Sequence, residues 1–187
     1  MIDPQWADLP RNLPIPVDDG AAQHLEGALL PSVVLPSTHA SMVDLSMVGP
    51  AVVFFFPRTG RPGQADLVPE WDSIPGARGC TPQVCGFQEG LPEFEKRGYA
   101  VLGVSTQSTD YQAEMSRRLG VEYPILSDVA LRLVHAMSLP VLSVKGHTLI
   151  KRMSWIVRDG RIHHVFYPVF PPDRSAAEVL KWIDAAP

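Results

Sequence analysis

Cysteine is the residue type in this chain best suited to chemistry, and the chain has two of them, Cys80 and Cys85. They lie five positions apart in the stretch Gly-Cys-Thr-Pro-Gln-Val-Cys-Gly-Phe. Three kinds of site use such a pair: a structural disulfide or inert buried thiols, a metal centre, and a pair of redox-active thiols. The neighbouring residues help to choose among these interpretations.

A metal centre is the interpretation that the sequence supports least. A structural zinc site needs four ligands, and the chain has no second pair of cysteines. The adjacent histidines His163 and His164 are candidates, but neighbouring residues of a strand point to opposite faces, so only one could reach a shared site. We therefore expect no metal. Inert thiols stay an open alternative, because free cysteine is often simply a small core residue.

The redox interpretation rests on where Cys80 lies relative to the next helix. The spacing of apolar residues predicts a helix over residues 84–97. Thr81 suits its N-cap, and Pro82 suits the first helical position. Cys80 would therefore lie at a helix N-terminus, where free N–H groups and the helix dipole favour an anion. A thiol in such a place is partly ionised at neutral pH, and the thiolate is the nucleophilic form.

Helix geometry limits what Cys85 can do. Two helical residues five positions apart are separated by about 7.5 Å of rise and point about 140° apart. A disulfide needs Cα atoms within roughly 7 Å and converging side chains, so the pair cannot bond while the helix stays wound. Gly86, Gly90 and Pro92 weaken the helix at this point. The hypothesis is a switching segment that is helical when reduced and locally unwound when oxidised.

The elements that hold these thiols follow from the hydrophobic pattern. Residues 51–56, Ala-Val-Val-Phe-Phe-Phe, are typical of a central strand buried on both faces. A 22-residue loop, 58–79, separates this strand from Cys80, and so long a loop is usually functional. Strands alternate with helices, and a hairpin at Asp159-Gly160 and a last helix follow, which predicts an α/β sandwich with a mixed sheet. The expected strands are 32–36, 42–45, 51–56, 99–105, 123–126, 147–158 and 161–167, and the expected helices are 84–97, 109–119, 127–137 and 175–185, with a helical piece near 21–29.

Length and composition indicate one globular domain, 31–187, preceded by an irregular N-terminal arm, 1–30. The net charge is −4 without a basic run, so we expect no nucleic-acid partner. The longest apolar runs are too short to cross a bilayer, and the N-terminus lacks the pattern of a secretory leader. We therefore expect a cytoplasmic protein without membrane contact. In that compartment a disulfide is more often catalytic or redox-sensing than structural.

Several segments occur in the order typical of one enzyme family. Gly79-Cys80-Thr81 followed by Cys85-Gly86-Phe87 matches the pattern G-C-T-x-x-x-C-G-F. On these segments the chain resembles the peroxiredoxins, specifically the Q or bacterioferritin-comigratory group, over roughly residues 30–185. The other matching segments are 52–57 before the active-site loop, 91–94, 101–105, 123–128, and 152–157 with 159–162.

The resemblance implies a thioredoxin-like fold and an atypical two-cysteine thiol peroxidase acting on hydrogen peroxide or organic hydroperoxides. Cys80 would be the peroxidatic cysteine, Cys85 the resolving cysteine, and Arg152 the residue that stabilises the thiolate and polarises the peroxide. A sulfenic acid at Cys80 would condense with Cys85 to a disulfide, which thioredoxin or a similar dithiol would reduce. The resemblance implies no cofactor, and a monomer or weak homodimer.

The chain departs from the family pattern in the loop before Cys80. Pro57 begins that loop, and residues 64–79 read as an insert of about sixteen residues. The insert leaves Arg61 where the family has a threonine hydroxyl, with Thr59 nearby. The acidic residue often found three positions after the peroxidatic cysteine is Gln83 here.

Further residues are expected to support the site or the loop. The supporting residues are Pro57, Thr59, Arg78 and Thr81. Trp71 is expected to anchor the insert to the body, with a lid or a partner contact as the alternative. The apolar loop 167–172 is expected to line the pocket or a partner surface, with packing in the core as an equal alternative.

Two other functions fit the same cysteine pair. A disulfide oxidoreductase of the thioredoxin fold would normally carry its reactive pair as C-x-x-C. A redox sensor or binding module would use the Cys80–Cys85 disulfide to switch a surface.

Overall fold

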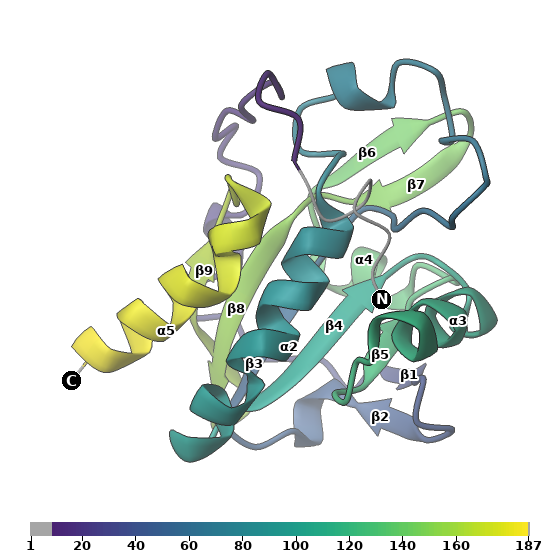
Figure 1. Ribbon diagram of the computed structural model, residues 1–187. Helices are drawn as coiled ribbons and strands as arrows, with labels where there is room; N and C mark the ends of the chain where they lie inside the picture. Colours follow the sequence, from purple (N-terminus) through teal and green to yellow (C-terminus); the bar gives the residue numbers. More distant parts are fainter. Residues whose placement is uncertain (1–8, 187) are drawn as a thin grey trace.

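The computed structural model describes residues 9–186 and centres on a five-stranded mixed sheet with the strand order β5-β4-β3-β8-β9 (Figure 1). Strand β3 pairs in parallel with β4, and β4 with β5, whereas β8 is antiparallel to both β3 and β9. This is the thioredoxin-like α/β arrangement that the sequence predicts. Two separate hairpins, β1-β2 and β6-β7, accompany the main sheet.

The bounds of the elements agree with most of the expected ranges. The strands are β1 (Val34–Pro36), β2 (Met42–Asp44), β3 (Ala51–Phe55), β4 (Ala100–Ser105), β5 (Ile125–Ser127), β6 (Val141–Val144), β7 (His147–Ile150), β8 (Met153–Arg158) and β9 (Arg161–Phe166). The helices are α2 (Cys80–Lys96), α3 (Thr109–Leu119), α4 (Arg132–Met137) and α5 (Ser175–Ala185), with 3-10 turns η1 (Gln23–Leu25), η2 (Leu45–Met47), η3 (Trp71–Ser73) and η4 (Pro172–Arg174).

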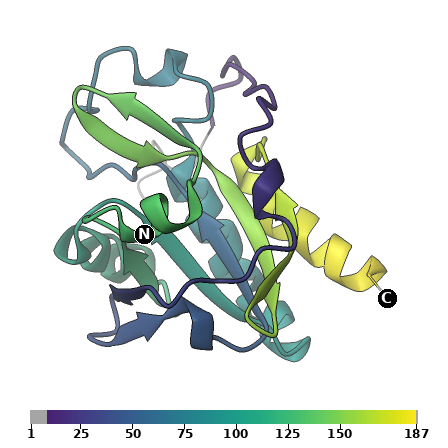
Figure 2. The ribbon, with the colours of Figure 1, turned by 180° about the vertical axis from the view of Figure 1, so that it is seen from behind.

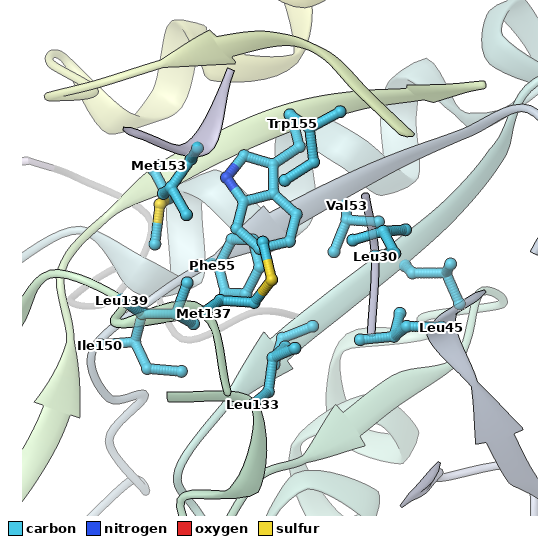
Figure 3. Close-up of a cluster of buried hydrophobic side chains, with 14 of the residues drawn as sticks. Leu30, Leu45, Val53, Phe55, Leu133, Met137, Leu139, Ile150, Met153 and Trp155 are labelled. Carbon is cyan, nitrogen blue, oxygen red and sulfur yellow. The ribbon is translucent and has the colours of Figure 1, made fainter. Parts of the chain in front are cut away.

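Strand β3 lies at the centre of the sheet and is buried along its whole length. Helices α2 and α5 cover one face of the sheet (Figure 1). On this face Phe54 stacks on Phe87 of α2 with ring centroids 4.1 Å apart. On the other face, Phe55 lies 4.3 Å from Trp155 within a second apolar cluster that includes Met137 of α4 (Figure 3). The continuous apolar run thus supplies both halves of the core, because alternate side chains point to opposite faces.

The segment before β1 packs against the body on the face opposite to α2 (Figure 2). Leu29 forms a bridge with Arg161, and backbone N–H groups of Gly27 and Leu30 donate to carbonyls of β9 and its hairpin. The expected helical piece is the short turn η1. The division into an arm over 1–30 and a domain over 31–187 stays a prediction, and its residues 1–8 lie outside the described part.

Two element boundaries differ from the prediction in ways that bear on chemistry. Helix α2 begins at Cys80 and its N-cap is Gly79, so the expectation that Thr81 caps the helix was wrong. The expected single strand 147–158 is two strands, β7 and β8, which Lys151 and Arg152 separate. Arg152 therefore lies at a break between strands rather than within a flat ladder.

The start of α4 also differs from the prediction, and a buried carboxylate contacts its first turn. Helix α4 begins at Arg132, five residues after the predicted start at residue 127, and its N-cap is Leu131. Asp128 accepts hydrogen bonds from the N–H groups of Leu133 and Val134, so its side chain, rather than further helical turns, satisfies these donors.

The long loop before α2 is packed down on the β6-β7 hairpin (Figure 1). Trp71, in η3, is almost fully buried there. Its neighbours in this small cluster are Leu67, Val68, Ile74, Ala77, Leu142, Val144 and Leu149. Trp71 therefore anchors the insert to the body, as expected.

Candidate active site

The site is built around the first residue of α2. Cys80 is 3% exposed, and its thiol lies at the helix N-terminus, where the sequence placed it. Gly79, directly before it, has φ +102, and a side chain there would collide with the ring of Pro172. Glycine is therefore required to bring the insert, η4 and the start of α2 so close together.

Arg152 crosses from the break between β7 and β8 to the thiol of Cys80. Its Nη2 lies 3.3 Å from Sγ and also donates to the carbonyls of Gly76, Ala77 and Arg78, at 3.2, 3.3 and 3.0 Å. These three carbonyls belong to the end of the insert. The structure thus brings together two of the predicted catalytic residues, which are 72 positions apart in sequence.

The charge of Arg152 lacks a carboxylate partner among the described residues, although the side chain is 3% exposed. A buried cation is costly unless hydrogen bonds and opposite charge compensate it. Backbone carbonyls supply the hydrogen bonds, and the guanidinium places a positive charge 3.3 Å from the sulfur of Cys80. The Cys80 thiol also lies 3.5 Å from the carbonyl of Ala77.

Gln83 is a functional residue whose role the sequence did not indicate. It is fully buried, one turn after Cys80, and its side-chain oxygen accepts a hydrogen bond from Nη1 of Arg152. Its amide nitrogen lies 3.5 Å from the hydroxyl of Ser175. The feature of the sequence that could have indicated this role is the spacing of three residues between Cys80 and Gln83, which places both side chains on one face of the helix. A neutral amide here orients the guanidinium without neutralising it.

Of the four predicted supporting residues, Thr59, Arg78 and Thr81 line a cavity of about 580 Å³ that Cys80 also lines. Thr59 is buried, and its N–H and hydroxyl both donate to the side-chain oxygen of Gln107, at 2.9 and 3.1 Å. Thr81 is also buried, and Pro57 is buried just before the loop. The cavity is lined by Leu9, Pro10, Arg58, Thr59, Gly60, Gly63, Gln64, Ala65, Asp66, Leu67, Trp71, Asp72, Arg78, Gly79, Cys80, Thr81 and Pro82.

Arg78 contributes to the site through its backbone as well as its side chain. Its carbonyl accepts from Arg152, whereas its guanidinium forms ion pairs with Asp66 and Asp72 of the insert. These contacts stabilise the wall of the cavity. That Arg78 also supports the thiolate stays a prediction.

Cys85 lies in the same helix and is half-buried, and both cysteines are free thiols. Burial raises the pKa of the Cys85 thiol, the nearby carboxylate of Glu89 raises it further, and Arg118 opposes this. Cys85 is therefore held protonated while α2 is wound. The wound helix also keeps the two thiols on different sides of its axis, as its spacing requires.

The two adjacent histidines lie outside this site. His164 stacks on Trp182 of α5 with ring centroids 4.7 Å apart, and its Nδ1 lies 3.1 Å from a carboxylate oxygen of Glu26. His163 is exposed at the irregular position of the β8-β9 ladder. Within residues 9–186 no three of His, Cys, Asp and Glu gather as a metal site, and no helix is long and apolar enough to cross a membrane.

The chain matches the family described as Redoxin over residues 25–180. It is 25% identical over 185 residues to peroxiredoxin Q, chloroplastic, of Gentiana triflora, covering 95% of this chain and 77% of that one. It is 28% identical to peroxiredoxin Bcp of Escherichia coli (strain K12), covering 84% and 94%. Among solved structures, the peroxidoxin BcpB of Mycobacterium tuberculosis has the same fold, with a TM-score of 0.69 at 23% identity over 87% of this chain and 97% of that one. The chain belongs to the redoxin family, as a thiol peroxidase of the peroxiredoxin Q/Bcp type.

Proposed function

We propose that the protein reduces hydrogen peroxide or organic hydroperoxides through a sulfenic acid at Cys80 and an intramolecular Cys80–Cys85 disulfide. The observation that carries the proposal is the 3.3 Å contact between Nη2 of Arg152 and Sγ of Cys80 at the base of an open cavity. A cation beside a helix N-terminal thiol is the environment that makes a cysteine nucleophilic.

In the first step the Cys80 thiolate attacks the terminal, hydrogen-bearing oxygen of the hydroperoxide. The S–O bond forms as the O–O bond breaks, which gives Cys80 sulfenic acid and an alkoxide or hydroxide that takes a proton from water. Arg152 donates toward the sulfur and is placed to donate to an oxygen that approaches it. Such a donor stabilises the negative charge as it moves from sulfur to the leaving oxygen.

In the second step the sulfur of Cys85 displaces the hydroxyl of the sulfenic acid. The S–S bond forms, the S–O bond breaks, and one water leaves with the proton of the Cys85 thiol. Because the wound helix separates the thiols, the first turns of α2 must open before this step. Thioredoxin or a similar external dithiol then restores both thiols by exchange.

The cavity supports organic hydroperoxides as well as hydrogen peroxide. Its volume of about 580 Å³ far exceeds the ~30 Å³ that a water molecule occupies, and it falls in the usual range for small-molecule sites. Apolar side chains of Leu67 and Trp71 and the charged side chains of the insert share its wall. The cytoplasmic location and the monomer or weak homodimer stay predictions.

The test is to mix reduced protein with hydrogen peroxide and with an organic hydroperoxide in a stopped-flow instrument and to follow thiol loss. The wild type should lose two thiols per peroxide, Cys80→Ser should not react, and Cys85→Ser should stop at a sulfenic acid that dimedone traps. Thiols that survive micromolar peroxide for seconds in the wild type would exclude the proposed function.

A further inference from the structure

We propose that the hydroxyl of Tyr123 is a latch on the turn of α2 that carries Cys85, and that it sets how fast the Cys80–Cys85 disulfide forms. The inference rests on the proposed function. Tyr123 is 2% exposed, and its hydroxyl donates to the carbonyl of Val84 at 2.8 Å. Val84 directly precedes Cys85 and is itself fully buried.

The hydroxyl of Tyr123 acts as a donor throughout the physiological range. Burial raises its pKa well above the usual value, and the neighbouring Cys85 raises it further, so the proton stays on the oxygen. As an internal carbonyl of α2, Val84 also accepts the helical hydrogen bond from four residues on. The Tyr123 bond is therefore additional, and it ties this turn to the segment before β5.

The same segment makes a second contact with α2, at a residue that lies beyond Cys85. The N–H of Glu122 donates to the side-chain oxygen of Gln88 at 2.8 Å. Gln88 follows Cys85 in α2, whereas Val84 precedes it. Residues 122–123 thus hold α2 at two points, one inside the segment between the two thiols and one beyond it.

Disulfide formation must release the inner of these two points. The reaction converts Cys80 sulfenic acid and the Cys85 thiol to a disulfide and water, and the sulfurs can meet only if the chain between them leaves its helical path. Val84 lies in that chain, so the Tyr123 bond exists only in the wound form. The bond therefore stabilises the state in which Cys80 reacts with peroxide and slows the step that follows. The contact at Gln88 lies beyond Cys85 and can persist.

The substitution Tyr123→Phe removes the hydroxyl and keeps the ring, which packs edge-on against Phe54. Tyr123 does not line the cavity at Cys80, so the peroxide-dependent phase should keep its wild-type rate. The disulfide-forming phase should be about two- to tenfold faster, the range that corresponds to one net hydrogen bond. The peroxide dose that overoxidises half of Cys80 should rise by the same factor, because the sulfenic acid lives for a shorter time.

Tyr99→Phe is the matched control, because it also removes a buried hydroxyl, one that contacts Arg158 at the far end of the sheet. It should leave both phases unchanged. Equal acceleration in the two variants would mean general loosening and would overturn the latch, as would a disulfide phase in Tyr123→Phe at the wild-type rate.

A readout without peroxide separates this inference from the proposed function. Native-state amide exchange over residues 83–88 of the reduced protein should be faster in Tyr123→Phe than in the wild type by the same factor. If no variant reacts with peroxide, the proposed function fails and the exchange rates alone decide on the latch. Unchanged exchange overturns the latch even where the peroxidase reaction is intact.

Discussion

Arg152→Lys tests the central contact of the site while it keeps the positive charge. The guanidinium of Arg152 reaches Sγ of Cys80 at 3.3 Å, three carbonyls of the insert through the same nitrogen, and Gln83 through the other. An ammonium is a single point with three donors on a shorter reach, so it cannot serve all of these acceptors. The sulfur and the three carbonyls all contact the terminal Nη2, which the shorter lysine does not reach, so the contact with sulfur should be lost.

The expected size of the effect follows from that lost contact. A hydrogen bond that involves a charged group contributes about 1.5–3 kcal/mol, which corresponds to about a 10- to 150-fold change in rate. The second-order rate constant for thiol oxidation by hydrogen peroxide should fall by that factor, measured by stopped-flow at a peroxide concentration well above that of the protein. The circular dichroism spectrum of the reduced variant should match that of the wild type.

Arg158→Lys is the matched control for this substitution. Arg158 ends β8, the strand that follows Arg152, and its side chain contacts Tyr99 rather than the cavity. It should change the rate constant less than twofold. If Arg152→Lys folds and reacts within threefold of the wild-type rate, then the guanidinium does not stabilise the transition state and the proposed role of Arg152 is wrong.

Three other substitutions test neighbouring parts of the argument. At Gly79 the backbone has a positive φ, and an added methyl group would collide with Pro172, so Gly79→Ala should lower the free energy of unfolding in urea by well over the ~1 kcal/mol that backbone strain alone costs. Gly98 also has a positive φ but lies in open space, so Gly98→Ala should lower it by only about that ~1 kcal/mol. The pKa of the Cys85 thiol is raised only in the wound helix, so the wound form is favoured at low pH and is disfavoured as the pH rises past the ordinary thiol range. The rate of disulfide formation should therefore increase with pH. Glu89→Gln should shift this increase to lower pH, because the Glu89 carboxylate raises the pKa of Cys85, and an unshifted pH profile would contradict that role of Glu89. Trp71→Ala should expose the insert 64–79 to limited proteolysis while amide exchange in β3 stays slow; protection of the insert at the wild-type level would show that Trp71 does not anchor it.

The central strand and the active-site helix could be predicted because local sequence determines them. Residues 51–56 are apolar at every position and rich in β-branched and aromatic residues, which is typical of a strand buried on both faces, and β3 is buried along its whole length. The start of α2 was misplaced because its N-cap, Gly79, offers no side-chain signal and takes its conformation from contacts with distant residues.

The features that the sequence did not indicate depend on contacts between distant segments. Residues 147–158 keep a strand-like pattern throughout, so the break at Arg152 could not be read from it. The contacts of Gln83 with Arg152 and of Tyr123 with Val84 join residues 69 and 39 positions apart. Hydrophobic periodicity carries no information about such pairs, because it reports which face is buried and not what lies opposite.

The insert and Gln83 are best explained together. Residues 76–78 lie near the end of the insert, and their carbonyls hold Arg152 against Cys80. Backbone carbonyls compensate a guanidinium by dipoles and leave its net charge in place, and so does the neutral amide of Gln83. A carboxylate in that position would compete with the thiolate for the same cation. No carboxylate among residues 9–186 pairs with Arg152, so in the proposed mechanism the inserted loop and the missing acid act in the same direction: both leave the positive charge of Arg152 to the sulfur of Cys80.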